Sequence, residues 1–380
     1  MILEALKYVR YKGEPREWKI TGKDSRADSF VEFSNINFLV GKNASGKSRS
    51  LTAIKEIAEY VGGKRSIEDS TFEDESFEVR FTDGADKYAY TLAYRDRVIE
   101  SETLIVNGKE ALNRETKKIM DLDKGAVIPF PEDASSPLIF RLGETGISYF
   151  SKLVLWGSSL RNYNFTNELE KSTFVPDYKQ MSPHPSYSKY TMSLVYIFNK
   201  GYEDFGEAYI NEIKEHMFHI GYENITDILI RESKKGFGLY IEEDGKYCVS
   251  QQQMSQGLFR ALGLFIRLTY YVMSKTSVCV LVDDIGEGID FDRSRTMINI
   301  ITKRINSSNI QLFITTNNRY VMNQIPLRYW NVIERKQSMS IFHNYFNSKE
   351  IFEDFKYTGL NNFDFLATDF YKKGFNELED

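Results

Sequence analysis

The chain has 380 residues, of which 42% are hydrophobic and 27% charged, and its formal net charge is -5. This length and composition are typical of a globular protein with one large domain or two intertwined ones. The acidic balance does not indicate a strongly basic nucleic-acid-binding domain, although a local basic groove can exist on an acidic protein. The two cysteines, Cys248 and Cys279, form no CxxC pair, which argues against a disulfide framework or a zinc site.

The distribution of apolar residues argues against a secreted protein and against a membrane-spanning one. The first residues, MILEALKYVRYKGEPREWK, mix apolar and charged side chains, unlike a signal peptide. No run of about 18 apolar residues occurs, so we expect no membrane span and a cytoplasmic protein.

The N-terminal part of the chain alternates predicted strands with one helix. Ile2–Val9 alternates apolar and polar residues, and Asn35–Val40 is a second apolar strand that leads into a glycine-rich loop. Ser48–Tyr60 has helical spacing of its apolar residues. Further strands, expected to form an antiparallel sheet beside the core, are predicted at Phe77–Phe81, Tyr88–Tyr94 and Val98–Val106.

The middle of the chain has a looser pattern. Residues 109–200 contain most of the prolines, so we expect an insertion of helices and loops there, with a loop at Ser182–Tyr190. Helical periodicity returns at Tyr202–Gly221. Two strands are then predicted, at Ile225–Glu232 and Phe237–Glu242.

The last third alternates helices with very apolar strands. The predicted elements are a helix at Ser255–Ser274, a strand at Ser277–Val282, a helix at Ser294–Ile305 and a strand at Ile310–Thr315. Such alternation predicts an α/β fold with a sheet covered on both faces. We expect three parts, namely an N-terminal lobe (1–108), an insertion (109–200) and a C-terminal lobe (201–380).

The strongest chemical signal is Gly41–Ser48, GKNASGKS, which fits the phosphate-loop pattern GxxxxGK[ST] between a strand and a helix. In that pattern the backbone N–H groups and the helix N-terminus bind phosphate oxygens. Lys47 is expected to reach the β- and γ-phosphates of ATP, and Ser48 to ligate Mg²⁺. The other expected nucleotide contacts of this segment are Gly41, Asn43, Ala44, Ser45, Gly46 and Arg49.

A second signal is the apolar strand that ends in Asp283 and Asp284. A buried strand can deliver carboxylates to the edge of the sheet where the phosphates bind. Asp283 is then expected to support Mg²⁺ through water, and Asp284 to polarise the attacking water as a catalytic residue. The alternative is a solvated acidic turn.

A third signal is Met254-Ser255-Gln256-Gly257-Leu258, at the start of a predicted helix. The order of phosphate loop, Ser-x-Gly helix start and paired acids resembles ABC-type ATPases of the SMC, RecF and OLD-like branch. The resemblance implies the ABC-ATPase fold, with a mixed central sheet, an antiparallel β subdomain and a helical insertion. It also implies that Ser255 and Gly257 contact the γ-phosphate held by a second protomer. Alternatively, Ser255 is a plain helix N-cap.

By the same resemblance, Asp290 occupies the D-loop position that crosses the dimer interface, and Asn317 the switch position. The family pattern has Glu where Asp284 stands and His where Asn317 stands. The shorter acid and the missing histidine together predict slow hydrolysis. An adenine-stacking aromatic is not identified, Tyr8 and Tyr11 being candidates, and no glutamine lies between Ser48 and Gln180.

Further segments, MSQGLFRAL, VDDIGEGIDF, TTNNRYVMN and KYTGLNNFDFLATDF, resemble bacterial AAA-family ATPases that have the ABC fold. Many of these belong to antiphage defence operons, such as PARIS and Septu-like systems. The resemblance implies a sensor ATPase that uses ATP and Mg²⁺. It would assemble as a homodimer or higher oligomer and control a separately encoded effector, such as a nuclease. Its trigger would be DNA or a phage protein. The alternatives are a DNA-repair or DNA-end ATPase of the RecF or SMC kind, and the ATPase subunit of a transporter.

Overall fold

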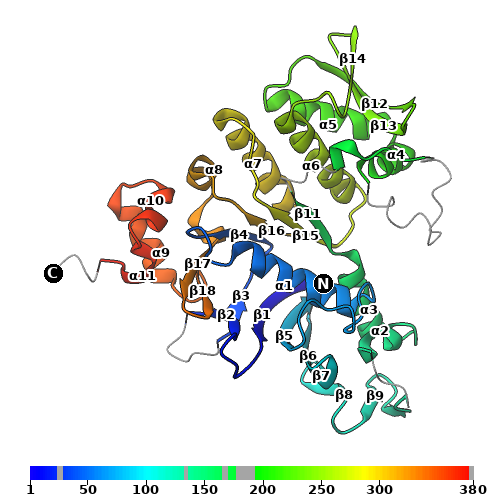
Figure 1. Ribbon diagram of the computed structural model, residues 1–380, viewed down its shortest axis with the longest axis vertical. Coiled ribbons are helices and arrows are strands. Elements are labelled where there is room, and N and C mark those ends of the chain that lie inside the picture. Colours follow the sequence, from blue (N-terminus) through cyan, green and yellow to red (C-terminus); the bar gives the residue numbers. More distant parts are fainter. Residues whose placement is uncertain (24–28, 132–135, 165–169, 177–192, 376–380) are drawn as a thin grey trace.

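One large mixed sheet runs through most of the molecule, and helices cover its central part (Figure 1). The computed structural model describes residues 1–23, 29–131, 136–164, 170–176 and 193–375. The loop expected at Ser182–Tyr190 lies outside these residues.

The central strands are parallel to one another, and all but the edge strand Arg161–Asn164 are largely buried on both faces. The apolar sequences of these buried strands explain their position, because a strand covered on both sides has no polar face. They follow the order β11-β15-β16-β4-β17 across the sheet. Their bounds are β11 (Arg161–Asn164), β15 (Val278–Asp283), β16 (Ile310–Thr315), β4 (Ile36–Val40) and β17 (Trp330–Lys336).

Alternate side chains of these strands enter two different cores. Phe38 and Val40 belong to the same core as the buried residues of α6 and α7, whereas Leu39 belongs to the core under α1 and α3. On the first face lie α6 (Gln256–Met273), α7 (Phe291–Asn306) and α8 (Arg319–Gln324). On the second lie α1 (Lys47–Val61), α2 (Leu138–Gly143) and α3 (Ser148–Ser159).

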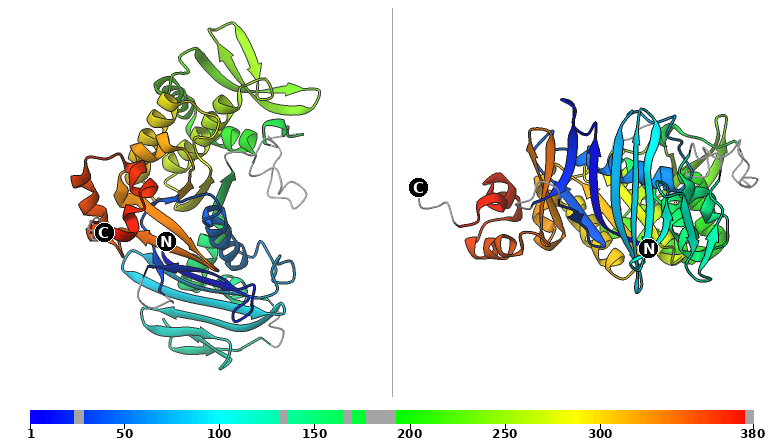
Figure 2. Two further views of the ribbon diagram at one scale, coloured as in Figure 1. Left: turned by 60° about the vertical axis from the view of Figure 1, so that its left-hand side comes forward. Right: turned by 90° about the horizontal axis from the view of Figure 1, so that it is seen from below.

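The sheet continues beyond β17 as largely antiparallel strands. Strand β18 pairs with β17 in a hairpin and with β2 in parallel, and β2 leads to β1 and a meander from β5 to β10. The predicted antiparallel strands are therefore confirmed, and they share one sheet with the core (Figure 2). The bounds are β1 (Ile2–Arg10), β2 (Trp18–Gly22), β3 (Val31–Glu32), β5 (Glu75–Asp83), β6 (Asp86–Arg95), β7 (Val98–Val106), β8 (Lys109–Asn113), β9 (Lys118–Asp121), β10 (Ala126–Ile128) and β18 (Met339–Asn344).

The segment 109–200 is not only helices and loops, and this part of the prediction is wrong. It opens with β8, β9 and β10, which extend the meander, and β11 joins the parallel core beside β15. Asn107-Gly108, where both residues have positive φ, forms the tight turn that returns the chain from β7 to β8. An Asn-Gly pair is a strong hairpin signal, so the sequence contained the cue for the first of these strands.

A second, smaller sheet and two helices form the upper lobe in Figure 1. The single helix predicted over Tyr202–Gly221 is instead two helices, because Gly206 has a φ of 61° and ends the first of them. The lobe packs on α6, whose apolar face belongs to the same core. Its elements are α4 (Leu194–Phe205), α5 (Glu207–His219), β12 (Ile225–Ser233), β13 (Gly236–Glu243) and β14 (Tyr247–Ser250).

Short helices at the C-terminal end pack beside β17 and β18 (Figure 1). Phe352, Phe365 and Phe370 form their aromatic core. These helices are α9 (Lys349–Asp354), α10 (Asn362–Ala367) and α11 (Phe370–Lys373).

Candidate functional site

The glycine-rich loop joins β4 to α1, as the phosphate-loop pattern requires. Gly46, directly before the helix, has a φ of 110°, a conformation that L side chains rarely adopt. A Cβ at this position would also overlap the hydroxyl of Ser340, which donates a hydrogen bond to the carbonyl oxygen of Ser45 (2.9 Å). The β17–β18 hairpin therefore supports the loop, and only glycine fits position 46.

Lys47 is the buried cation of the site. Its side chain is 7% exposed, and its Nζ donates to the carbonyl oxygens of Gly41 (2.8 Å) and Lys42 (3.3 Å). Burial lowers the pKa of Lys47, while the carboxylates of Asp284 and Asp283 oppose that shift. Backbone carbonyls accept hydrogen bonds but carry no net charge, so this ammonium can form a stronger, charge-assisted bond to a phosphate.

Asp283 and Asp284 lie at the end of β15, beside the start of α1. The Ser48 hydroxyl donates to Asp283 Oδ1 (3.1 Å), and the Thr315 hydroxyl donates to the same oxygen. Thr315 Oγ1 also accepts the backbone N–H of Asp284 (2.8 Å). Asp284 has a φ of 58°, so the chain turns sharply between the two acids. One buried threonine at the end of β16 thus holds both acids in place.

Asn317 lies next to Asp284. Its Nδ2 donates to Asp284 Oδ1 (3.2 Å), which fixes the carboxylate of the expected catalytic acid. Burial raises the pKa of Asp284, the Asp283 carboxylate raises it further, and Lys47 opposes both. The amide at the switch position therefore contacts the acid itself within one chain.

These residues enclose a cavity of about 300 Å³. This volume is at the lower end of the range for small-molecule sites. The lining residues are Asn43, Ala44, Ser45, Gly46, Lys47, Ser48, Arg49, Asp284 and Asn317. Backbone N–H groups at a helix start, a buried ammonium and an arginine suit a phosphate chain. The hydroxyl of Ser48 and the carboxylate of Asp283 supply the oxygen ligands that Mg²⁺ prefers.

The expected signature and D-loop residues lie elsewhere in the chain and do not line this cavity. Ser255 caps α6 by accepting the N–H of Leu258 (3.3 Å), so its N-cap role is observed. Gly257 packs against the D-loop, where a Cβ would lie 2.5 Å from the carbonyl oxygen of Gly288. Asp290 caps α7 and pairs with Arg293 (3.0 Å). The helix start and the D-loop therefore form one packed unit apart from the cavity.

Of the aromatic candidates for adenine stacking, Tyr8 is excluded. It is 1% exposed and its hydroxyl donates to the buried carboxylate of Glu75. Tyr11 is partly exposed, but the guanidinium of Arg16 lies 3.6 Å from its ring centroid and already covers it.

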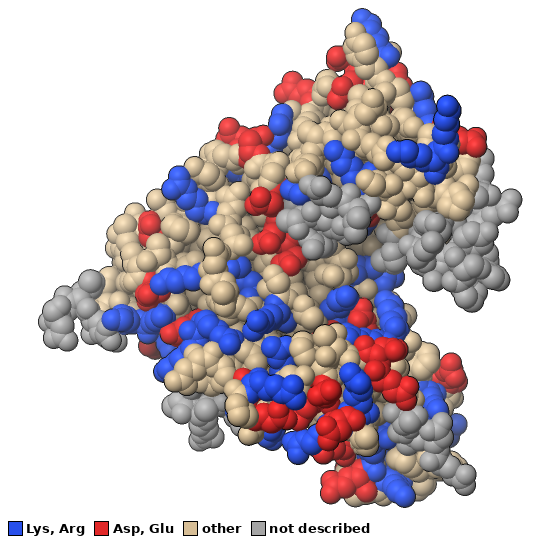
Figure 3. Space-filling view, in the orientation of Figure 1, with Lys and Arg blue, Asp and Glu red and all other residues tan. Residues whose placement is uncertain are grey.

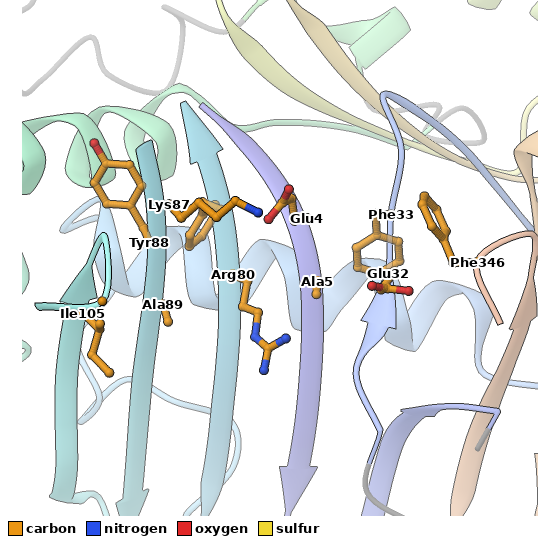
Figure 4. A pocket seen from close by; sticks show the side chains of 12 residues that line it. Glu4, Ala5, Glu32, Phe33, Arg80, Lys87, Tyr88, Ala89, Ile105 and Phe346 are labelled. Atoms are coloured by element: carbon orange, nitrogen blue, oxygen red, sulfur yellow. The ribbon is translucent and has the colours of Figure 1, made fainter. Parts of the chain in front are cut away.

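A larger hollow, of about 390 Å³, lies on the outer face of the sheet across β6, β5, β1 and β3, with α1 behind the sheet (Figure 4). Its charged residues are two acids and two bases, Glu4, Glu32, Arg80 and Lys87. None of the expected phosphate-binding residues lines it. Its size alone does not indicate a functional site.

Two residues with no role predicted from the sequence hold these two regions in place, one at the acids and one at the start of α6. Thr315 bridges the acids, as described above. Arg260 in α6 donates to the carbonyl oxygen of Glu287 (2.7 Å) and so ties the signature helix to the D-loop. A threonine two residues before the switch position, Asn317, was the visible signal for Thr315, whereas Arg260 had no local signal.

Within the described ranges, no group of three or more His, Cys, Asp or Glu side chains could hold a metal ion. No helix in those ranges is both long and apolar enough to cross a membrane.

Comparison with profiles of known protein families and with curated protein sequences finds no match. The structure is similar to an SMC head bound to the C-winged helix domain of ScpA, with a TM-score of 0.52 and 13% identity over 90% of this chain and 97% of that one. An Smc head domain with an extended coiled coil, bound to the C-terminal domain of ScpA derived from Pyrococcus furiosus, gives 0.51 and 12% over 93% and 99%. At these identities the likeness concerns the fold, and the chain has the ABC-type ATPase fold of SMC heads.

Proposed function

We propose that this chain is an ATP-binding ABC-type ATPase whose sites are completed by a second copy. The observation that carries the proposal is the gathering of Lys47, Ser48, Asp284 and Asn317, from three separate segments, around one cavity, with Asp283 bonded to Ser48 beside it. Each of these segments follows a parallel strand, and the fold of SMC heads is compatible with this use.

In this proposal the loop N–H groups and Lys47 bind the phosphates of ATP, and Ser48 and Asp283 hold Mg²⁺. The ion, when bound, neutralises charge on the phosphate oxygens. Asp284 accepts a hydrogen bond from the attacking water, and Asn317 keeps its carboxylate oriented. Because Asp284 is one methylene shorter than glutamate, its reach is reduced, and slow hydrolysis is expected.

The second copy is needed because one chain supplies no group to the open side of its own cavity from α6 or the D-loop. Ser255 and the free N–H groups at the start of α6 are suited to a phosphate. In a head-to-tail dimer they would face the γ-phosphate held by the other copy, and Asp290 would lie at the interface. Each dimer then contains two shared sites.

The test is the mass of the purified chain in solution, by light scattering, with and without ATP and Mg²⁺. The Asp284→Asn variant is expected to accumulate as ATP-bound dimers, because it binds ATP but is impaired in activating water. Lys47→Ala is expected to stay monomeric. If ATP leaves all three proteins monomeric, or if Lys47→Ala binds ATP as well as the unmodified chain does, the proposal is wrong.

At the biological level, we propose a sensor ATPase of antiphage defence that controls a separately encoded effector through ATP-dependent assembly. The support is the motif resemblance to AAA-family ATPases of defence operons. Co-purification of the ATP-bound Asp284→Asn dimer with the product of a neighbouring gene is the expected result. Toxicity of this chain expressed alone would contradict it, since the killing activity is assigned to the effector.

A DNA-repair or DNA-end ATPase of the RecF or SMC kind is the second candidate, and the SMC-head fold favours it. Its mark would be ATP hydrolysis stimulated by duplex DNA, with a steep loss of stimulation as salt is raised. The two SMC heads compared above are bound to domains of ScpA, so a protein partner of this chain is also compatible with the fold.

A further inference from the structure

A run of oppositely charged side chains connects the phosphate loop with the C-terminal helices. Lys42, the second residue of the loop, pairs with Asp369, the residue before α11, at 3.1 Å between Nζ and Oδ2. Lys372 in α11 lies 4.0 Å from the same oxygen and pairs with Glu334 of β17 at 2.9 Å. His343 Nε2, in β18, lies 3.0 Å from the other carboxylate oxygen of Glu334. These residues are here called the ion-pair chain, and Figure 3 shows basic and acidic side chains next to one another over the region of α11, β17 and β18.

The two ends of the ion-pair chain differ in how they are held. On the hairpin side, Tyr371 of α11 is 2% exposed, and its ring meets that of His343 edge-on, with 4.9 Å between the centroids. On the loop side the contact is polar, because the side chain of Lys42 is 63% exposed and pairs with Asp369. This ion pair therefore links a well-packed helix to an exposed position of the loop.

The pair differs from an isolated surface ion pair, which contributes little to stability. Among the described residues, Oδ1 of Asp369 is buried without a hydrogen-bond partner. The charge of this carboxylate is therefore balanced at Oδ2, by Lys42 and, at a longer distance, by Lys372. A partly buried carboxylate that loses its nearest cation is destabilised, so the Lys42 contact is favoured.

The loop residue that α11 holds by its side chain is also held by its backbone at the cavity. The carbonyl oxygen of Lys42 accepts a hydrogen bond from Lys47 Nζ (3.3 Å), the ammonium that the proposed function assigns to the phosphates. Further along the loop, the carbonyl oxygen of Ser45 accepts the hydroxyl of Ser340, in β18. The loop is thus tied at two points to one unit, formed by α11 and the β17–β18 hairpin. A loop already held in its binding shape loses less conformational freedom when a ligand binds.

We propose that α11 is a brace for the phosphate loop, whose docking through Asp369 and Lys42 favours the binding of MgATP. Coupling between two sites is reciprocal, so bound MgATP favours the docking of α11 to the same extent. Neither residue lines the cavity, and both act as positioning residues through the loop backbone. The inference rests on the proposed function and adds regulation to it. A partner that displaces α11 would weaken ATP binding and, with it, ATP-driven assembly.

The first experiment is calorimetric titration of the full chain with MgATP. Asp369→Asn keeps the size of the side chain but removes its charge, and it should weaken binding about two- to fivefold, the upper part of the range for partly exposed ion pairs. In the Lys42→Gln background, where the pair is already broken, the same substitution should not weaken binding. The control is Asp354→Asn, which removes an acid from the end of α9 and should bind as the unmodified chain does.

The sign of the Asp369→Asn effect separates positioning from plain electrostatics. Removing a carboxylate near the triphosphate would by itself strengthen the binding of an anion. A positioning role predicts the opposite sign. Folding is not at stake in the Lys42→Gln variant, because this side chain is 63% exposed and lies outside the C-terminal aromatic core. Tighter binding by Asp369→Asn, or an equal change in both backgrounds, would overturn the inference.

The reciprocal effect is measured by hydrogen exchange of the backbone amides in α10 and α11. Saturating MgATP should slow this exchange about two- to fivefold in the unmodified chain and in Asp354→Asn, but not in Lys42→Gln. A purely structural ion pair would protect these helices equally with and without nucleotide. If the unmodified chain binds MgATP and the exchange does not change, the inference alone is overturned. If the unmodified chain binds no MgATP, the proposed function fails and the inference fails with it.

Discussion

At the scale of single residues, Thr315 distinguishes this site from a plain acidic turn. Its hydroxyl donates to Asp283 and accepts the N–H of Asp284, so one side chain fixes the metal-supporting acid and the water-positioning acid together. Strand β15 alone could not hold both acids in this arrangement, because Asp284 has a φ of 58° and so leaves the extended conformation of the strand. The chemistry assigned to the pair depends on a residue from the neighbouring strand.

Thr315→Val should therefore reduce ATP hydrolysis by about 10- to 100-fold, since misplaced catalytic groups lose activity steeply. Removing a buried hydrogen-bond partner should also destabilise the fold by about 1–3 kcal/mol. Thr316→Val is the matched control, because Thr316 is equally buried but donates to the carbonyl oxygen of Ile285 (3.1 Å). Hydrolysis rates at saturating ATP and Mg²⁺ test this. Equal losses in the two variants would show that Thr315 has no special role.

The parts of such a site that can be predicted from the sequence are those formed by residues close together in the chain. Gly41–Ser48 carries its own turn glycines and helix start, and both ends of the strand Ile310–Thr315 are predicted correctly because only Gln311 interrupts its apolar run. Thr315 was visible, but its partners come from another strand. Likewise, nothing in Arg161–Asn164 indicates that it pairs with Val280–Asp283, since pairing between distant strands leaves no local pattern. The limits at 108 and 200 stay predictions.

At the scale of elements, a buried carboxyl pair joins α1 to the antiparallel sheet. Glu56 in α1 and Glu75 in β5 are 3% and 0% exposed, and the hydroxyls of Tyr8 and Tyr94 donate to Glu75. Burial, then the neighbouring Glu75 carboxyl, raise the pKa of Glu56 from 4.5 to about 7, while Arg65 opposes the shift. The helix that carries Lys47 thus contains a buried carboxyl group, Glu56, whose pKa is raised to about 7.

The sign of the pH effect follows from linkage. Between pH 4.5 and about 7 the folded state keeps the Glu56 proton that the unfolded chain releases, so this contribution to stability is full below 4.5 and lost as pH rises through 7. Glu56→Gln mimics the protonated form. Relative to the unmodified chain, it should gain on the order of 2 kcal/mol between pH 5 and pH 8.

Thermal unfolding at both pH values measures this difference. Glu59→Gln, on the same helix but only partly buried, serves as the control and should leave the pH dependence unchanged. A Glu56→Gln curve parallel to that of the unmodified chain would mean that Glu56 does not titrate in this range.

The start of α6 is the second element whose packing can be tested. A Cβ at Gly257 would lie 2.5 Å from the backbone oxygen of Gly288, so Gly257→Ala must push the helix away from the D-loop. We expect a cost of about 1–3 kcal/mol and weaker ATP-driven dimerisation. ATP binding by the monomer should be unaffected, because Gly257 does not line the cavity.

Gly263→Ala in the same helix is the comparison, because the nearest atom to its Cβ is the side-chain oxygen of Tyr163 at 3.0 Å. Denaturant unfolding and light scattering with ATP report the two effects separately. If both alanine variants dimerise equally well, the contact between α6 and the D-loop has no part in assembly.

At the scale of the whole molecule, the separation of the cavity from Ser255 makes dimerisation testable by complementation. Lys47→Ala removes the phosphate-binding half of a shared site, and Ser255→Arg blocks the other half without touching the cavity. Each variant alone should be inactive. In an equal mixture half of the dimers are mixed, and each mixed dimer has one site with both halves intact. Activity should therefore return to on the order of a quarter of the normal value. No recovery, together with intact ATP binding by Ser255→Arg, would mean that a single chain carries the whole site.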